Sequence, residues 1–180
     1  GVTFSLKYAK ELNLDPRQTY IKILDEMKVK NIRLPSYWNI IEKTFENDDF
    51  EDLDFMLREG QKREVKVILV LGAKQPRWPE CHVPSWAKNL KVSDRQEEIL
   101  EFITKVVQRY RDHPSIFAWQ VENEPFLRAF GQGCDDPDEN FFKKEIQLVR
   151  NLSSKPIIVS DSGELGLWIS PMKVSDIFGT

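Results

Sequence analysis

The sequence predicts an α/β fold in which the strands of a parallel sheet alternate with helices. Short β-branched runs are separated by longer segments whose apolar residues recur at helical spacing. The run from Val65 to Leu71 is almost wholly apolar, as in a parallel strand buried on both faces. Units of about 30 to 50 residues suit a (β/α)8 barrel or a doubly wound open sheet. No Gly-x-Gly-x-x-Gly or phosphate-binding loop follows a strand, so the pattern favours the barrel.

The first half of the chain is expected to contain three strands and two helices. Asp15 is a good N-cap, Pro16 suits the first helical position, and Gln18 completes a capping box. Pro35 ends the second strand, because proline cannot donate a ladder hydrogen bond. A second helix is expected over residues 50–62. The strands are expected at Val2–Ser5, Asn31–Leu34 and Val65–Leu71.

The second half of the chain repeats this alternation. Ser93 is expected to cap a third helix, which ends before His113-Pro114. Asp136 is expected to cap a fourth helix from Pro137 to Leu152. Two more strands are expected at Ile116–Glu122 and Pro156–Ser160, and a sixth begins within Val174–Phe178.

Charge and hydropathy exclude several classes of protein. The formal net charge is −3, so the chain offers no electrostatic basis for binding nucleic acid or an anionic membrane. No run of about 18 apolar residues is present, so no segment is expected to cross a bilayer. No signal peptide stands at the start of the chain. Localisation therefore stays open, with export or a place in the cell envelope expected if a leader has been removed.

Residues 1–180 are expected to form one domain, an incomplete (β/α)8 barrel that stops after the start of strand six. A whole barrel takes about 250 residues, and five βα units plus one strand account for about two-thirds of that. Such a piece leaves two sheet edges and apolar faces uncovered. We therefore expect the chain to be unstable, to associate with itself, or to pair with the missing C-terminal part of the barrel.

The five tryptophans lie in or just after predicted strands. The carboxyl ends of the strands form the active-site face of a barrel, and flat aromatic rings on a cleft commonly stack on sugar rings. Tryptophans on this rim are therefore candidates for such stacking. The structural alternative is that tryptophans pack beneath long loops.

Asn123-Glu124-Pro125 ends the fourth predicted strand. The triplet directly follows an apolar run, so its carboxyl group leaves a buried strand, and Pro125 stops the ladder there. A carboxyl group at such a half-buried place can act as a general acid. The ordinary alternatives for Glu124 are a solvated carboxylate and a helix cap.

Three segments resemble the clan A glycoside hydrolases. Ile116–Pro125 resembles the clan's fourth strand, which ends in an Asn-Glu pair, often followed by Pro, whose Glu is the acid/base. Arg33, in Ile32-Arg33-Leu34-Pro35, resembles the strand-two arginine that supports the nucleophile. The segment 37–54, which starts Tyr-Trp-Asn-Ile-Ile-Glu, resembles the second unit of family 5 cellulase-like and family 42 β-galactosidase-like enzymes.

This resemblance implies retaining hydrolysis of an oligo- or polysaccharide. Glu124 would be the acid/base, and Asn123 would bind the hydroxyl next to the anomeric carbon. Arg33 would belong to the substrate site, and His82 is a further candidate for binding substrate. Three tryptophans would be sugar platforms: Trp38, Trp119 and Trp168. No metal and no other cofactor is implied.

The clan's nucleophile is a Glu at the end of strand seven, and the chain stops at strand six. Glu164 follows strand five, two barrel positions too early, and is expected with Asp161 to orient substrate or cap a helix. Glu42 and Glu80 follow strands two and three and are expected on the rim. The chain alone is therefore expected not to hydrolyse glycosides.

The two cysteines leave three alternatives open. Cys81 and Cys134 follow neighbouring strands and are predicted to form a disulfide in an exported protein. Free thiols are equally compatible with the sequence. A zinc site with His82 and Asp135 or Asp136 is disfavoured, because the usual Cys-x-x-Cys spacing is absent.

Two other functions compete with glycoside hydrolysis. A carbohydrate-binding barrel without catalysis would keep the aromatic rim and lack a strand-seven Glu. A metal-dependent isomerase or endonuclease would need several His and carboxylate ligands, and the chain has two His.

Overall fold

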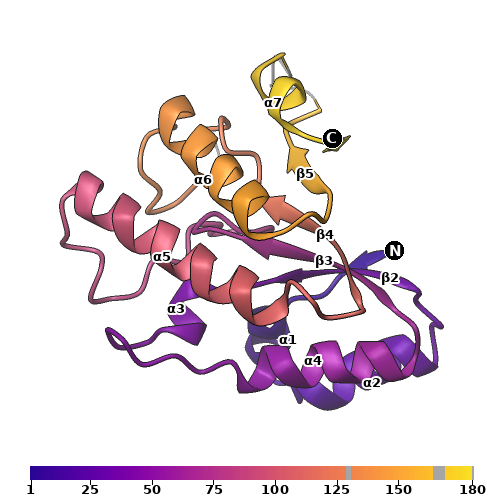
Figure 1. Ribbon diagram of the computed structural model, residues 1–180. Coiled ribbons are helices and arrows are strands. Elements are labelled where there is room, and N and C mark those ends of the chain that lie inside the picture. The colour runs from indigo at the N-terminus through magenta and orange to yellow at the C-terminus, as the bar shows by residue number, and fades with distance from the viewer. Residues whose placement is uncertain (129–130, 164–168, 180) are drawn as a thin grey trace.

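The computed structural model describes residues 1–128, 131–163 and 169–179. Six parallel strands form one sheet in the order β1-β2-β3-β4-β5-β6 (Figure 1). Strands that follow one another along the chain are therefore neighbours in the sheet, as in a (β/α)8 barrel and unlike a doubly wound sheet. The strands are β1 (Val2–Thr3), β2 (Asn31–Pro35), β3 (Lys66–Leu71), β4 (Ile116–Val121), β5 (Ile157–Ser160) and β6 (Ile177–Gly179).

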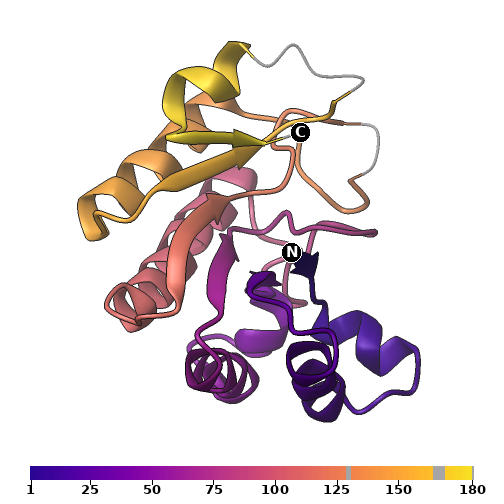
Figure 2. The same ribbon diagram turned by 90° about the vertical axis from the view of Figure 1, so that its right-hand side faces the viewer.

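The sheet curls into a half-barrel with the main helices along its outer face (Figure 2). These helices are α2 (Pro16–Asp25), α4 (Glu51–Lys62), α5 (Val92–Tyr110) and α6 (Glu139–Leu152). The predicted fold class is confirmed. Among the described residues, no helix combines the length and apolar character needed to cross a membrane.

Two of the three predicted N-cap residues need correction. Asp15 caps α2 as expected, since its carboxylate accepts a hydrogen bond from the Gln18 amide at 2.8 Å. Ser93 lies inside α5, where its hydroxyl donates to the neighbouring Asp94 instead of capping the helix. Asp136 lies before the true N-cap of α6. That residue is Asp138, whose carboxylate accepts hydrogen bonds from two amides of the first turn.

Three short helices were not predicted from the sequence. They are α1 (Leu6–Glu11), α3 (Trp38–Ile41) and α7 (Ile169–Val174). Elements of four to six residues are too short to show a helical period. The first of them is capped by Ser5, whose hydroxyl accepts a hydrogen bond from the Tyr8 amide at 3.1 Å.

The two faces of the sheet differ in character. Side chains on the outer face, such as Leu34, Leu69 and Trp119, are fully buried against the helices. On the inner face Arg33 and Ile68 are only partly buried. Successive side chains of a strand point to opposite faces of the sheet. The polar residues of the inner face therefore lie inside the half-barrel, below the loops at the carboxyl ends of the strands.

Candidate active site

Glu124 lies just beyond the carboxyl end of β4, at the mouth of the half-barrel. Its backbone is in the left-handed region, with φ 46°, and its side chain is half-buried. The Glu124 amide donates to the hydroxyl of Ser160, the last residue of β5, at 3.2 Å. Its carbonyl oxygen accepts a hydrogen bond from the Lys74 ammonium at 2.8 Å. The end of β5 and the loop after β3 therefore hold this residue from both sides.

Arg33 and Asn123 are joined across the inner face by Gln120 of β4. The Arg33 guanidinium donates to the Thr3 hydroxyl at 2.9 Å and to the Gln120 amide oxygen at 3.3 Å. The Gln120 amide nitrogen in turn donates to the Asn123 amide oxygen at 3.4 Å. This contact leaves the Asn123 side-chain N–H groups without a partner among the described residues, so they can donate to a ligand. Burial lowers the pKa of Arg33, and the Glu124 carboxylate opposes that shift.

These residues line an open cleft of about 470 Å³ at the carboxyl ends of the strands. Its charged and amide side chains come from β2, from β4 and from the loops after β3 and β4. The charged and amide side chains are Arg33, Arg77, Glu80, Gln120, Asn123 and Glu124. The structure thus brings together Arg33, Asn123 and Glu124, which the sequence singled out on different elements.

Glu42 and Glu80, expected on the rim, are both buried. Glu42 accepts a hydrogen bond from the Trp38 indole at 3.0 Å and pairs with Lys105 at 3.2 Å, so it braces the structure. Glu80 lines the cleft and lies 3.4 Å from the Lys74 ammonium. Burial raises the pKa of Glu80, and the Lys74 charge opposes the shift. No local sequence signal marked Glu80 as a cleft residue.

Trp38 and Trp119 are not sugar platforms, because both have 0% exposure. Trp38 packs edge-on against Trp86, and its ring stacks on Phe102 of α5. Trp119 faces the helices on the outer side of β4, and its indole donates to the Ser153 hydroxyl at 2.9 Å. Packing beneath helices and loops, the structural alternative, is correct for both.

His82 is also enclosed, with 3% exposure. Its ring meets Tyr37 edge-on with centroids 4.4 Å apart. Burial, helped by the charge of Lys7, lowers the pKa of His82 to about 4. A neutral ring that packs on Tyr37 is a structural histidine, so the prediction that His82 contacts substrate is not retained. Trp168 and Glu164 lie outside the described residues.

Trp78, in place of Trp38 and Trp119, presents an exposed aromatic surface. It lies on the loop after β3, next to cleft residue Arg77, and 55% of its side chain is exposed. Its ring is therefore accessible to a sugar beside the cleft.

Cys81 and Cys134 form a disulfide, with their Cα atoms 5.3 Å apart. The bond ties the loop after β3 to the loop after β4, the two loops that carry Glu80 and Glu124. Paired sulfur atoms provide no thiolate, so the alternatives of a zinc site and of free thiols are wrong for this structure.

Reducing this disulfide is expected to destabilise the fold. The bond closes a loop of 53 residues, for which the chain-entropy model gives a stabilisation of about 4 kcal/mol. We expect urea unfolding of the Cys81→Ser/Cys134→Ser double variant to show a loss of about 2–4 kcal/mol. Dithiothreitol should lower the stability of the wild type and leave the variant unchanged. An unchanged wild type would contradict the bond.

Comparison with known proteins identifies the family of the chain. The family profile described as Cellulase (glycosyl hydrolase family 5) matches residues 3–170. Mannan endo-1,4-beta-mannosidase F of Aspergillus fumigatus is 25% identical over 132 residues, which cover 68% of this chain and 28% of that relative. The protein of the same name from Aspergillus clavatus is 31% identical over 127 residues, covering 65% of this chain and 28% of the relative.

Solved structures show the same fold. A β-galactosidase from the psychrophilic Marinomonas ef1 superposes with a TM-score of 0.70 at 16% identity, covering 99% of this chain and 40% of that chain. GH5_18 from Streptomyces cattleya, solved in complex with GlcNAc, gives 0.62 at 12% identity, covering 88% and 43%. The chain therefore spans less than half of these structures and 28% of the two mannosidases. Since the family profile covers nearly all of its residues, the chain belongs to glycoside hydrolase family 5.

Proposed function

We propose that the cleft is the acid/base half of a retaining glycosidase site and that Glu124 is the acid/base. The observation that carries this proposal is the place of Glu124. It lies half-buried beyond β4, in one cleft with Arg33 and Asn123. General acids must reach a substrate oxygen while staying partly shielded from water.

The proposed reaction has two steps. In the first, protonated Glu124 donates its proton to the glycosidic oxygen as a second carboxylate attacks the anomeric carbon, and the sugar–oxygen bond breaks. In the second, Glu124 takes a proton from water, which displaces the second carboxylate and releases the sugar. The free N–H groups of Asn123 donate to the hydroxyl next to the anomeric carbon.

The proposed substrate is a β-mannan or a related β-linked polysaccharide. The named relatives are mannan endo-1,4-beta-mannosidases, and an extended chain would run along the cleft toward the exposed ring of Trp78. Stacking of a sugar on that ring would add apolar contact beside the polar cleft.

We further propose that the second carboxylate comes from outside these 180 residues. Among the described residues, Glu80 and Glu124 are the carboxyl groups that line the cleft. Glu80 is paired with the Lys74 ammonium, and this ion pair makes the Glu80 carboxylate less available as a nucleophile. A retaining site needs its two carboxyl groups about 5–5.5 Å apart on either side of the sugar.

The chain alone is therefore expected to show no turnover of mannan or of an aryl β-mannoside. Activity should appear in a completed barrel, which we define as residues 1–180 followed by the seventh- and eighth-strand part of a family 5 mannosidase. The measurement is reducing-sugar release by both proteins. Turnover by the chain alone that is lost in both Glu124→Gln and Glu80→Gln would overturn the proposal of an outside nucleophile. Sugar binding without turnover by the completed barrel would favour the non-catalytic alternative.

A further inference from the structure

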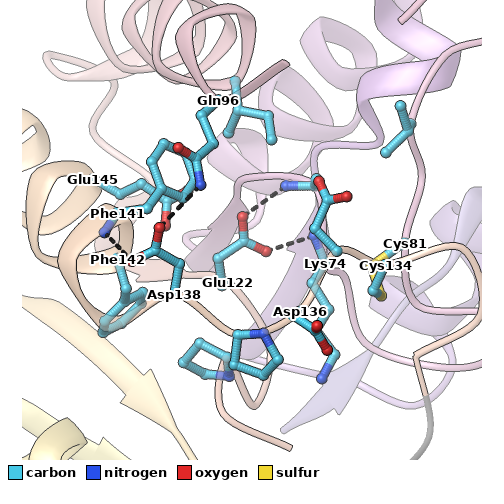
Figure 3. A pocket seen from close by; sticks show the side chains of 16 residues that line it. Lys74, Cys81, Gln96, Glu122, Cys134, Asp136, Asp138, Phe141, Phe142 and Glu145 are labelled. Carbon is cyan, nitrogen blue, oxygen red and sulfur yellow. Dashed lines mark hydrogen bonds between the residues drawn. A yellow bond between two sulfur atoms is a disulfide. The ribbon is translucent and has the colours of Figure 1, made fainter. Parts of the chain in front are cut away.

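Glu122 is a buried carboxylate two residues before Glu124, and its role is not explained by the reaction. Its oxygens accept hydrogen bonds from the amides of Ala73 and Lys74, at 2.8 and 2.5 Å (Figure 3). Its backbone is left-handed, with φ 54°, which turns the side chain toward the loop after β3. One carboxylate therefore satisfies two backbone donors of the neighbouring loop.

Gly72 is fitted to this carboxylate. Its φ is +91°, and a Cβ atom placed on it would lie 2.0 Å from the Glu122 Oε1 atom. A side chain at position 72 would therefore displace the Glu122 carboxylate from the two amides. The loop backbone at Gly72 and the Glu122 carboxylate therefore pack so closely that there is no room for a Cβ atom between them.

Glu145 of α6 lies against Glu122 and is 1% exposed. In Figure 3 Glu122 lies between Glu145 on one side and Lys74 on the other. Burial raises the pKa of Glu122 to about 7, and the neighbouring Glu145 and the two amide hydrogen bonds oppose this rise. Burial and the nearby Glu122 raise the pKa of Glu145 well above its ordinary value. Two ionised carboxylates would repel each other here, so the pair keeps a proton at neutral pH.

Among the described residues, the cavity beside the pair is lined by the Lys74 ammonium and by several further carboxylates. The Lys74 ammonium, from the loop after β3, favours the ionised form of Glu122. The loop before α6 brings carboxylates to the same cavity, while α5 contributes the uncharged Gln96 and Ile99. The carboxylates are Asp135, Asp136 and Asp138. Of these carboxylates, Asp135 is itself paired with the Arg95 guanidinium of α5 at 2.5 Å.

Lys74 connects this pair to the loop after β4, which carries Asn123 and Glu124, through three contacts. Its amide is held by Glu122, and its carbonyl oxygen accepts a hydrogen bond from the Asn123 amide at 2.8 Å. Its ammonium donates to the Glu124 carbonyl oxygen at 2.8 Å. A shift of Lys74 would thus move both residues that face the substrate.

We propose that Glu122 and Glu145, buried together behind the loop after β3, are positioning residues that set the backbone of Asn123 and Glu124 through Lys74. This role rests on the proposed function, in which Glu124 is the acid/base. Hydrogen exchange and thermal unfolding do not depend on catalysis, so the failure of either proposal can be told from the failure of the other.

The test compares two isosteric changes in the same pair. In Glu145→Gln the amide replaces the shared proton as a permanent donor to the Glu122 carboxylate, so the loop should stay closed. In Glu122→Gln the NH₂ group faces the two backbone donors and leaves one of them unpartnered. We expect hydrogen exchange in residues 72–77, measured by mass spectrometry at pH 6, to rise at least tenfold in Glu122→Gln and less than threefold in Glu145→Gln.

The pH profile separates this role from simple packing. A carboxyl pKa that is raised in the folded protein stabilises it fully below the ordinary pKa of about 4.5. That stabilisation is lost as the pH rises through the raised pKa of about 7. The melting temperature of the wild type should therefore fall between pH 5 and pH 8. Glu145→Gln should fall less, because one of the two groups no longer ionises.

Gly72→Ala disturbs the same contact from the side of the loop, and it replaces Glu122→Gln in the test if that variant does not fold. The added methyl group should open residues 72–77 to exchange as Glu122→Gln does. Wild-type exchange in Gly72→Ala would overturn the proposal. So would equal exchange in the two Gln variants, or a wild-type pH profile in Glu145→Gln.

Discussion

Replacing Glu124 by Gln in the completed barrel is expected to lower kcat/KM on mannan by about 10²–10⁴-fold, the usual contribution of a general acid–base group. Glutamine has the shape of the acid but cannot give a proton to the glycosidic oxygen or take one from water. The hydrogen bonds of the Glu124 backbone to Ser160 and Lys74 do not involve the carboxyl group, so the fold should be kept. The measurement is steady-state hydrolysis with the wild type in parallel.

Glu97→Gln is the matched control for this change. Glu97 is exposed on α5, away from the cleft, so the same chemical change there should leave activity and stability within error. The free energy of unfolding of Glu124→Gln should lie within about 0.5 kcal/mol of the wild-type value, as it usually does for surface substitutions. Activity within tenfold of the wild type would contradict the role given to Glu124, and an unfolded variant would contradict its placement.

Replacing Trp119 by Ala is expected to cost about 3–5 kcal/mol of the free energy of unfolding. The side chain has 0% exposure and is part of the main hydrophobic core. Its removal leaves a cavity between β4 and the helices, and the Ser153 hydroxyl loses the indole N–H that it accepts. Urea unfolding followed by circular dichroism measures the loss.

Trp78→Ala is the matched change at an exposed tryptophan. Because 55% of this side chain is exposed, its loss should change stability by less than about 0.5 kcal/mol. It should instead weaken the binding of a mannooligosaccharide, measured by calorimetry. The reverse pattern, with Trp119→Ala stable and Trp78→Ala unfolded, would restore Trp119 as the platform and contradict the burial.

The fold could be predicted because its signals are local. The apolar run of β3 and the cap at Asp15 each lie within a few residues, and both are as expected. The helix start at Asp138 was misplaced, because Asp136 and Asp138 are both acceptable caps two residues apart and only the turn geometry selects between them.

The site could be predicted only in part. Arg33, Asn123 and Glu124 share a cleft because parallel strands bring their carboxyl ends to one edge. Trp119 was expected on the cleft side of β4, which is wrong. Neighbouring residues of a strand point to opposite faces, and since Gln120 faces the cleft, Trp119 points away from it. The Lys74 contacts to the loop after β4 had no signal, since they join residues about 50 positions apart, beyond any local pattern.

The measurement that tests the central claim most directly compares two leaving groups in the Glu124→Gln completed barrel. An aryl mannoside with an acidic phenol departs without protonation, whereas a sugar alcohol needs the acid. We predict that kcat/KM stays within about tenfold of the wild type for a dinitrophenyl β-mannoside and falls by about 10²–10⁴-fold for mannan. Equal losses on both substrates would contradict the assignment of Glu124 as the acid that protonates the leaving group.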